Sequence, residues 1–315
     1  MRRVTAILFI IILALLPLFL DSYYVGLATL ILIVGIFAMS LDILQGYAGM
    51  ASLGHAAFWG TAAYVVGILN VKVLNGSHFA IEFIAGLCAA AIVAAVLGLI
   101  VLRSKGVYFL MILLASSMML WGVAFKWRSL TGGDDGLSGI SRPVLGLLGL
   151  NLQLHTHFYY FVLFFFIVSL VIMYLVVNST FGHTLIGIRE SEMRMQSLGY
   201  NIWLHKYIAF ILAGIFAGLG GILVAYYNGF VSPSELHLVN SAEVLIMVIL
   251  GGAGTLIGPA IGAAIIILIK NLASGFTEHW MIILGIIYIL TVMFTPEGVY
   301  NLFIGLLKRT AIWRH

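Results

Sequence analysis

Long apolar runs alternate with short polar intervals along almost the whole chain. A helix needs roughly 20 mainly apolar residues to cross the hydrocarbon core of a membrane. The runs cover residues 4–20, 23–41, 47–69, 79–102, 107–125, 158–177, 207–228, 241–250, 259–270 and 280–294. Because 241–250 and 259–270 are short and flank a Gly-rich break, we expect broken or re-entrant helices there. The pattern predicts an all-α polytopic membrane protein with about ten transmembrane segments.

Composition supports this fold class. Apolar residues make up 63% of the chain and charged residues 8%, whereas a soluble domain is about 25% charged. The N-terminus, Met1-Arg2-Arg3 and an apolar run, resembles a signal peptide. However, no small-residue cleavage site follows Pro17 and Asp21, and a second run begins at once. We therefore expect an uncleaved first helix.

Basic residues indicate the orientation, because cytoplasmic loops carry an excess of Lys and Arg. With ten crossings and the N-terminus inside, ten basic residues fall in inner intervals and five in outer ones. The inner ones are Arg2, Arg3, Arg103, Lys105, Arg189, Arg194, Lys206, Lys308, Arg309 and Arg314, and the outer ones are Lys72, Lys126, Arg128, Arg142 and Lys270. We expect cytoplasmic N- and C-termini and a cytoplasmic interval 182–206. This placement of basic residues accounts for the net charge of +4, which therefore does not indicate nucleic-acid binding.

The interval 182–206 is the most strongly charged and amphipathic part of the chain. Leu185, Ile188, Met195 and Leu198 follow one helical stripe. The pattern predicts a short helix at about 182–200, which Gly199 would end, with an i,i+4 pair of Glu190 and Arg194. Interfacial helices usually carry a richer Lys/Arg face, so this charge-mixed segment favours docking into a protein groove over lying on lipid.

Two Gly-rich stretches interrupt apolar runs in the two halves of the chain. Gly46-Tyr47-Ala48-Gly49 precedes Ser52, Gly54 and His55, and Gly251-Gly252-Ala253-Gly254 precedes Thr255 and Gly258-Pro259. Paired interruptions of this kind mark the pathway in transporters, but tight turns between packed helices would give the same pattern. His55 would then either line a pathway or make a hydrogen bond within the packing.

The outer interval holds Leu130-Thr131-Gly132-Gly133-Asp134-Asp135-Gly136. Two Asp residues fall well short of a calcium loop, so we expect a structural turn on the face that an outside partner meets, and no metal. The sequence holds no H-E-x-x-H, G-x-S-x-G or C-x-x-C motif and no Gly-Lys dipeptide. It therefore predicts neither catalytic residues nor a P-loop, and any ATPase would be a separate chain.

The run Met39–Leu69 resembles the signature of the branched-chain amino-acid ABC permeases, and of their LivM branch most closely. The matching residues are Gly46, Tyr47, Ala48, Gly49, Ser52, Leu53, Gly54, His55, Ala56, Ala57 and Phe58. Further matches follow in family order, at 106–109, 130–136, 181–190, 198–201, Lys206, 209–210, 250–259 and 296–298. The likeness covers nearly the whole chain.

The resemblance implies a single ABC importer transmembrane domain, 1–315, in the inner membrane of a bacterial or archaeal cell. It implies a second related permease, two ATPase subunits that bind ATP and Mg, and an extracytoplasmic solute-binding protein, with no cofactor on this chain. The helix near 182–200 would couple to the ATPase. Its expected coupling residues are Ile188, Arg189, Glu190, Glu192, Arg194, Leu198 and Gly199.

The resemblance also implies where cargo would pass and what it would be. The expected pathway residues are Gly46, Gly49, Ser52, Gly54, His55, Gly251, Gly254 and Thr255. Thr131, Gly132, Gly133 and Asp135 would face the binding protein. Hydrophobic amino acids are the leading cargo, with urea or a short amide as the alternative and an ATP-independent channel or carrier as the rival class. The chain departs from the family at Met50, where a Gln is usual, and at Arg194 and Met195, where paired Ala is common.

Overall fold

The computed structural model describes residues 13–74, 76, 78–145, 150–276, 285–286, 289 and 298–299. Within this part, seven helices are long and apolar enough to cross a membrane. They are Ser22–Tyr47, Ala56–Val73, Phe79–Val101, Val107–Lys126, His155–Val177, Ile202–Asn228 and Ile257–Gly275. The expectation of a polytopic all-α membrane protein is therefore confirmed. Most of the expected run 280–294 lies outside the described residues. So do residues 4–12 of the first expected run and both chain ends.

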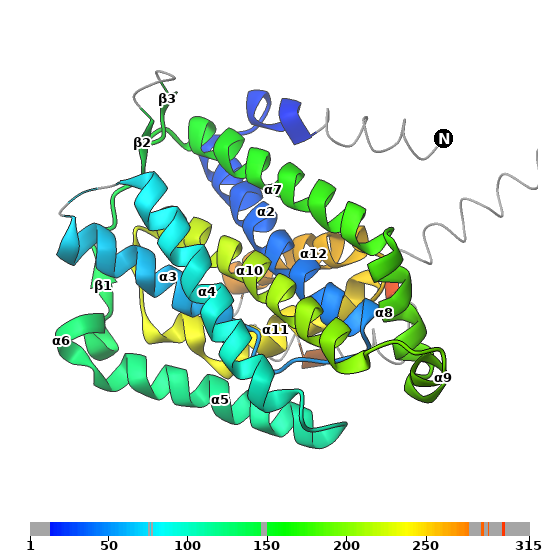
Figure 1. Ribbon diagram of the computed structural model, residues 1–315. Coiled ribbons are helices and arrows are strands. Elements are labelled where there is room, and N and C mark those ends of the chain that lie inside the picture. The colour runs from blue at the N-terminus through cyan, green and yellow to red at the C-terminus, as the bar shows by residue number, and fades with distance from the viewer. Residues whose placement is uncertain are drawn as a thin grey trace, which may run out of the picture.

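The helices are named as in Figure 1. The long ones are α2 (Ser22–Asp42, extended by a π-helical turn Ile43–Tyr47), α3 (Ala56–Ile68, extended by a π-helical turn Leu69–Val73), α4 (Phe79–Val101), α5 (Val107–Lys126), α7 (His155–Val177), α10 (Ile202–Asn228) and α12 (Ile257–Phe276). The shorter ones are α6 (Arg128–Thr131), α8 (Thr180–Glu190), α9 (Glu192–Ser197), α11 (Leu238–Gly251) and the 3-10 turns Leu16–Leu18, Gly133–Asp135 and Pro233–Leu236.

Three boundaries differ from the sequence expectation. The run 259–270 belongs to the 20-residue α12, which is neither short nor broken. The run 241–250 is α11, whose 14 residues span about 21 Å and fall short of the roughly 30 Å core. The run 47–69 becomes helical only at Ala56, and residues 48–55 return into the bundle as irregular chain.

Small residues draw the core helices together around α10, which packs on α2, α3 and α4. A Cβ on Gly218 would lie 2.3 Å from Ala90 Cβ, and one on Gly221 would lie 2.0 Å from Trp59 O. Lipid gives little hydrophobic drive for helix association, so close backbone approach through Gly and Ala supplies the packing energy instead. The helices α4, α5 and α7 keep broadly exposed faces, as expected for lipid or a neighbouring subunit.

The bundle has two ends, which Figure 1 separates clearly. The α6 end holds α6, the N-terminus of α7, the C-terminus of α10 and two short ladders, β1 (Leu137–Ser138) with β4 (Phe230–Val231) and β2 (Val144–Leu145) with β3 (Leu150–Asn151). The α8 end holds α8, α9, the α4–α5 turn and both Gly-rich breaks. Residues 182–206 and the Thr-Gly-Gly turn therefore lie at opposite ends.

Candidate coupling and translocation site

The two Gly-rich breaks touch each other at the α8 end. A Cβ on Gly46 would lie 2.2 Å from Gly254 N, so only glycine fits at this crossing. Asp42, fully buried at the end of α2, accepts hydrogen bonds from the backbone N–H groups of Gly254 (2.7 Å) and Leu256 (3.0 Å). Arg189 on α8 donates from Nη1 to the carbonyl oxygen of Gly46. We call these five residues the joint.

Backbone strain marks the same place. Leu256 has a φ of 60°, the one positive value of a non-glycine residue in the described chain. A conformation in this region costs about 1–3 kcal/mol and persists only where the surroundings impose it. Asp42 imposes it here, because its carboxylate holds the N–H of Leu256 as well as that of Gly254.

The remaining expected pathway residues fall into separate places. Gly49 lies beside Arg189, with a φ of 71° and a would-be Cβ 2.7 Å from Arg189 Cγ. Thr255 shapes the local turn, donating to Gly252 O at 2.6 Å and accepting from Gly258 N at 3.1 Å. Gly251 packs against Gly258 O, where a Cβ would lie 2.0 Å away.

Ser52, Gly54 and His55 make contacts other than those of the joint. His55 is fully buried, with Nε2 2.8 Å from Ser40 Oγ and its ring stacked on Phe37. Ser52 is fully buried as well, and a Cβ on Gly54 would meet Leu113 O at 2.6 Å. His55 thus makes the hydrogen bond that a packing role would need, and its place in a pathway stays a prediction.

The expected coupling helix is two helices. Ser191 breaks it with an extended conformation (φ −162°, ψ 103°), ending α8 at Glu190, and its hydroxyl then caps α9 by accepting from Arg194 N at 3.4 Å. The single helix and its Glu190–Arg194 pair are therefore wrong, because the break interrupts the i,i+4 geometry. Gly199 does end the segment, with a φ of 87°.

The break divides the apolar stripe between two surroundings. Leu185 and Ile188 on α8 are buried in the bundle, and Met195 on α9 is partly buried beside Gly187 of α8. Leu198 just after α9 is 71% exposed, and Met193, which lies off the stripe on α9, is 80% exposed. Glu190 and Arg194 are exposed as well. The segment therefore attaches through α8 and presents α9 outward.

Glu192 carries the ion pairs of this segment. It bonds Lys206 on α10 and, at 2.9 Å, Lys105 on the α4–α5 turn. The hydrogen bond from Lys206, aided by Lys105, holds the pKa of Glu192 below its usual value in spite of partial burial. The sequence singled out Glu192 and Lys206 but predicted neither ion pair nor the role of Asp42, because these contacts join separate parts of the chain.

At the α6 end, the predicted turn is present. Thr131 is buried, and its hydroxyl lies 2.6 Å from Ala124 O and 2.7 Å from Trp127 O. Gly132 and Gly133 have φ values of 80° and 66°, while Asp135 is exposed. Within the described residues, no group of three His, Cys, Asp or Glu side chains could hold a metal.

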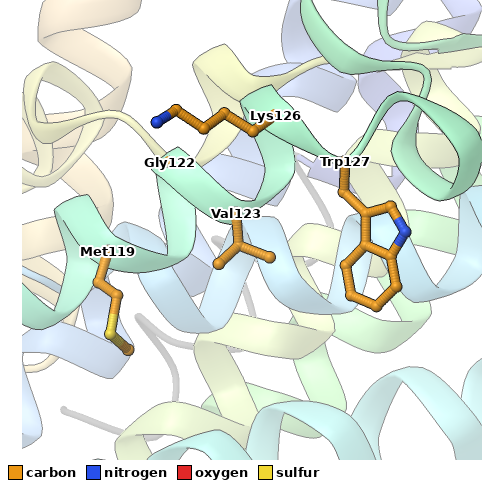
Figure 2. A pocket seen from close by; sticks show the side chains of 5 residues that line it. All are labelled: Met119, Gly122, Val123, Lys126 and Trp127. Carbon is orange, nitrogen blue, oxygen red and sulfur yellow. The ribbon is translucent and has the colours of Figure 1, made fainter.

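Figure 2 shows a shallow surface pocket on α5, lined by Met119, Gly122, Val123, Lys126 and Trp127. Its lining is apolar except for Lys126, and few polar groups converge on it. The lining residues are distant in sequence from those of the joint, and none of them is an expected pathway residue.

Comparisons with known proteins agree with the geometry. A family model described as the permease component of the branched-chain amino acid transport system matches residues 23–292. The LivM permease proteins of the high-affinity branched-chain amino acid transport systems of Escherichia coli and Salmonella typhimurium are each 30% identical over 297 residues, covering 87% of this chain and 69% of the relative. No solved structure matches. This multi-pass protein of the cell membrane therefore belongs to the branched-chain amino acid permease family.

Proposed function

We propose that this chain is one permease subunit of an ATP-driven importer that carries branched-chain amino acids across the inner membrane. Its partners are a second related permease, two ATPase subunits and an extracytoplasmic solute-binding protein. Both chain ends and the α8 end face the cytoplasm, and the α6 end faces outward. Basic residues at the α8 end, including Lys105, Arg189 and Lys206, support this orientation.

The contact of Arg189 with Gly46 carries the proposal. It ties the segment that would meet an ATPase to a backbone crossing where both Gly-rich breaks meet. A push on α9 reaches α8 across Ser191, and Arg189 transfers it to Gly46 and, through the tight crossing, to Gly254. The path opens because ATP binding favours one arrangement of this joint over another.

The test is leucine uptake by the complete reconstituted complex with its loaded binding protein, with and without ATP. We expect ATP-dependent uptake by the wild type. Arg189→Ala should lower it about two- to thirtyfold, the range of about 0.5–2 kcal/mol that single positions in coupling networks contribute. Arg103→Ala is the matched control, because Arg103 is exposed at the same end and its side chain makes no hydrogen bond or ion pair within the described residues.

Three results would contradict the proposal. Leucine uptake without nucleotide would indicate a channel or carrier. ATP-dependent uptake of urea in place of leucine would change the cargo. Equal uptake by Arg189→Ala and Arg103→Ala would remove the coupling role of the joint.

A further inference from the structure

The chain crosses the bundle between α10 and α12 in an unusual way. After β4 at the α6 end, residues 232–237 run inward as the 3-10 turn Pro233–Leu236, and only then does α11 begin at Leu238. Leu236 O lies 3.5 Å from Ser117 Oγ, and Ser117 stands at the middle of α5. Thus this irregular segment reaches the middle depth of the bundle. We call residues 232–237 the inner segment.

Irregular backbone at membrane depth persists only where protein buries it or where it lines a water-filled cavity. The inner segment is partly open, since Ser234 is exposed and Glu235 and His237 are only partly buried in this single chain. Polar groups at this depth would be costly against lipid. In the proposed complex, this face of the subunit therefore lies against the second permease subunit or against a water-filled path, and not against lipid.

Glu235 is the charged group of the inner segment. Its Oε2 accepts a hydrogen bond of 2.7 Å from Trp59 Nε1 on α3. Among the described residues, no Lys, Arg or His forms an ion pair with it. The positive end of the α11 dipole begins three residues later and favours a negative charge here. The carboxylate is thus held in place without a cation.

A buried hydroxyl without a partner lies on α3, one helical turn from the glycine that faces the inner segment. Tyr64 is 5% exposed, and its hydroxyl makes no hydrogen bond in the described chain. Tyr64 follows Gly60 by one helical turn, and Gly60 faces the inner segment, where a Cβ would lie 3.1 Å from the carbonyl carbon of Glu235. The Tyr64 hydroxyl is enclosed in this arrangement of the bundle, and a donor that reached it would satisfy a buried group that has no partner here.

We propose that Glu235, positioned by Trp59 and assisted by Tyr64, binds the ammonium group of the amino-acid cargo halfway through the path. An ammonium group has three N–H donors, which suit a carboxylate oxygen and a hydroxyl oxygen. Trp121 is partly exposed, its ring centroid lies 5.8 Å from that of His237, and it supplies apolar surface for the side chain. This inference rests on the proposed function, and it selects cargo that carries a positive charge over neutral urea.

The experiment is uptake by the complete complex with Glu235→Gln, which keeps the shape and the acceptor for Trp59 but removes the charge. We expect leucine uptake to fall at least about tenfold, the effect of losing one charge-assisted hydrogen bond. Glu235→Asp, which keeps the charge, should retain more uptake than Glu235→Gln. Asp21→Asn is the control, because Asp21 is exposed at the α6 end, outside the Thr131–Gly136 turn, and its side chain makes no capping hydrogen bond to α2. Basal ATPase activity and the melting temperature of each complex check assembly.

Tyr64→Phe gives a second test. It removes only the unpaired hydroxyl, so we expect normal folding, and a change in uptake would report on that hydroxyl. It should raise the KM for loaded binding protein or lower kcat while leaving the melting temperature unchanged. If the wild type imports leucine and Glu235→Gln matches Asp21→Asn, this inference is wrong and the proposed function stands. If the wild type imports urea and no leucine, both fall.

Discussion

The helices α8 and α9 are neighbours in sequence but differ in what holds them. The helix α8 buries Leu185 and Ile188 and reaches the joint through Arg189, whereas α9 and the residue after it leave Met193 and Leu198 exposed. One residue, Ser191, separates the two surroundings. Under the proposed function, α9 would meet the ATPase and α8 would convey the contact into the bundle. Changes at the buried contacts of α8 should then affect stability and transport together, whereas changes at the exposed apolar residues of the α9 side should affect partner binding alone.

The largest effect should follow Gly46→Ala at the joint. The added Cβ would lie 2.1 Å from Asp42 Oδ1 and 2.2 Å from Gly254 N, so the crossing must open. Overpacking of this kind costs about 1–3 kcal/mol or more. We expect a lower melting temperature of the purified chain and loss of uptake in the complete complex.

The matched control for that change is Gly122→Ala, where a Cβ would meet open space on α5. Gly122→Ala should melt at or above the wild-type temperature, because alanine favours a helix by about 1 kcal/mol over glycine. Equal behaviour of the two variants would contradict the tight crossing at the joint.

A change on the outward side should separate binding from stability. Leu198→Asp replaces an exposed apolar side chain, so the free energy of unfolding should change by no more than about 0.5 kcal/mol. Affinity for the ATPase subunits should fall about tenfold or more, as expected when one apolar anchor worth about 1.5–3 kcal/mol is lost. Co-purification and titration of the ATPase measure this.

Leu154→Asp serves as its control, because Leu154 is also exposed but lies at the α6 end. Its ATPase affinity should equal that of the wild type. A Leu198→Asp complex that binds ATPase normally would remove α9 as the docking surface.

The smallest effect should come from the ion pairs that steady the boundary between the two helices. Glu192→Gln should cost about 0.2–1 kcal/mol at pH 7, as exposed pairs do. The folded chain lowers the pKa of Glu192, so its stabilisation is complete above the unfolded pKa of about 4.3 and fades as pH falls through the lowered folded value. Thermal unfolding of wild type and variant from pH 7 to pH 3 measures the difference between their free energies of unfolding.

In that series, Glu190→Gln provides the reference, since Glu190 forms no ion pair in the described residues. Its stability should parallel that of the wild type at every pH. If the stability difference between Glu192→Gln and the wild type stays constant down to pH 3, the charge of Glu192 is not its cause.

The sequence predicted what local pattern can determine. Apolar runs located most of the helices, and Gly199 marked the end of α9 because its positive φ suits glycine. The break at Ser191 was missed, because a spacing of seven between Ile188 and Met195 fits one helix as well as two. Ser191 offers a capping hydroxyl, which is the one local sign of the break.

Contacts between distant segments were out of reach of sequence patterns. The two Gly-rich stretches looked alike, but nothing local indicated that Gly46 and Gly254 touch or that Asp42 binds the second stretch. The depth of the inner segment could not be predicted from sequence for a similar reason. Pro233 signals only a local turn, and the depth of Glu235 follows from its neighbours on α3 and α5.

The short ladder of β1 and β4 has a mechanical consequence. Ser138 pairs with Phe230, Leu137 pairs with Val231, and both N–H groups of Gly139 and Ile140 bond to Gly229 O. These bonds therefore join the turn at Thr131–Gly136 directly to the chain that leads into Pro233, by a shorter connection than the covalent one through α7 and α10. Under the proposed orientation, a displacement of that turn by a binding protein would reach the middle of the bundle through this ladder.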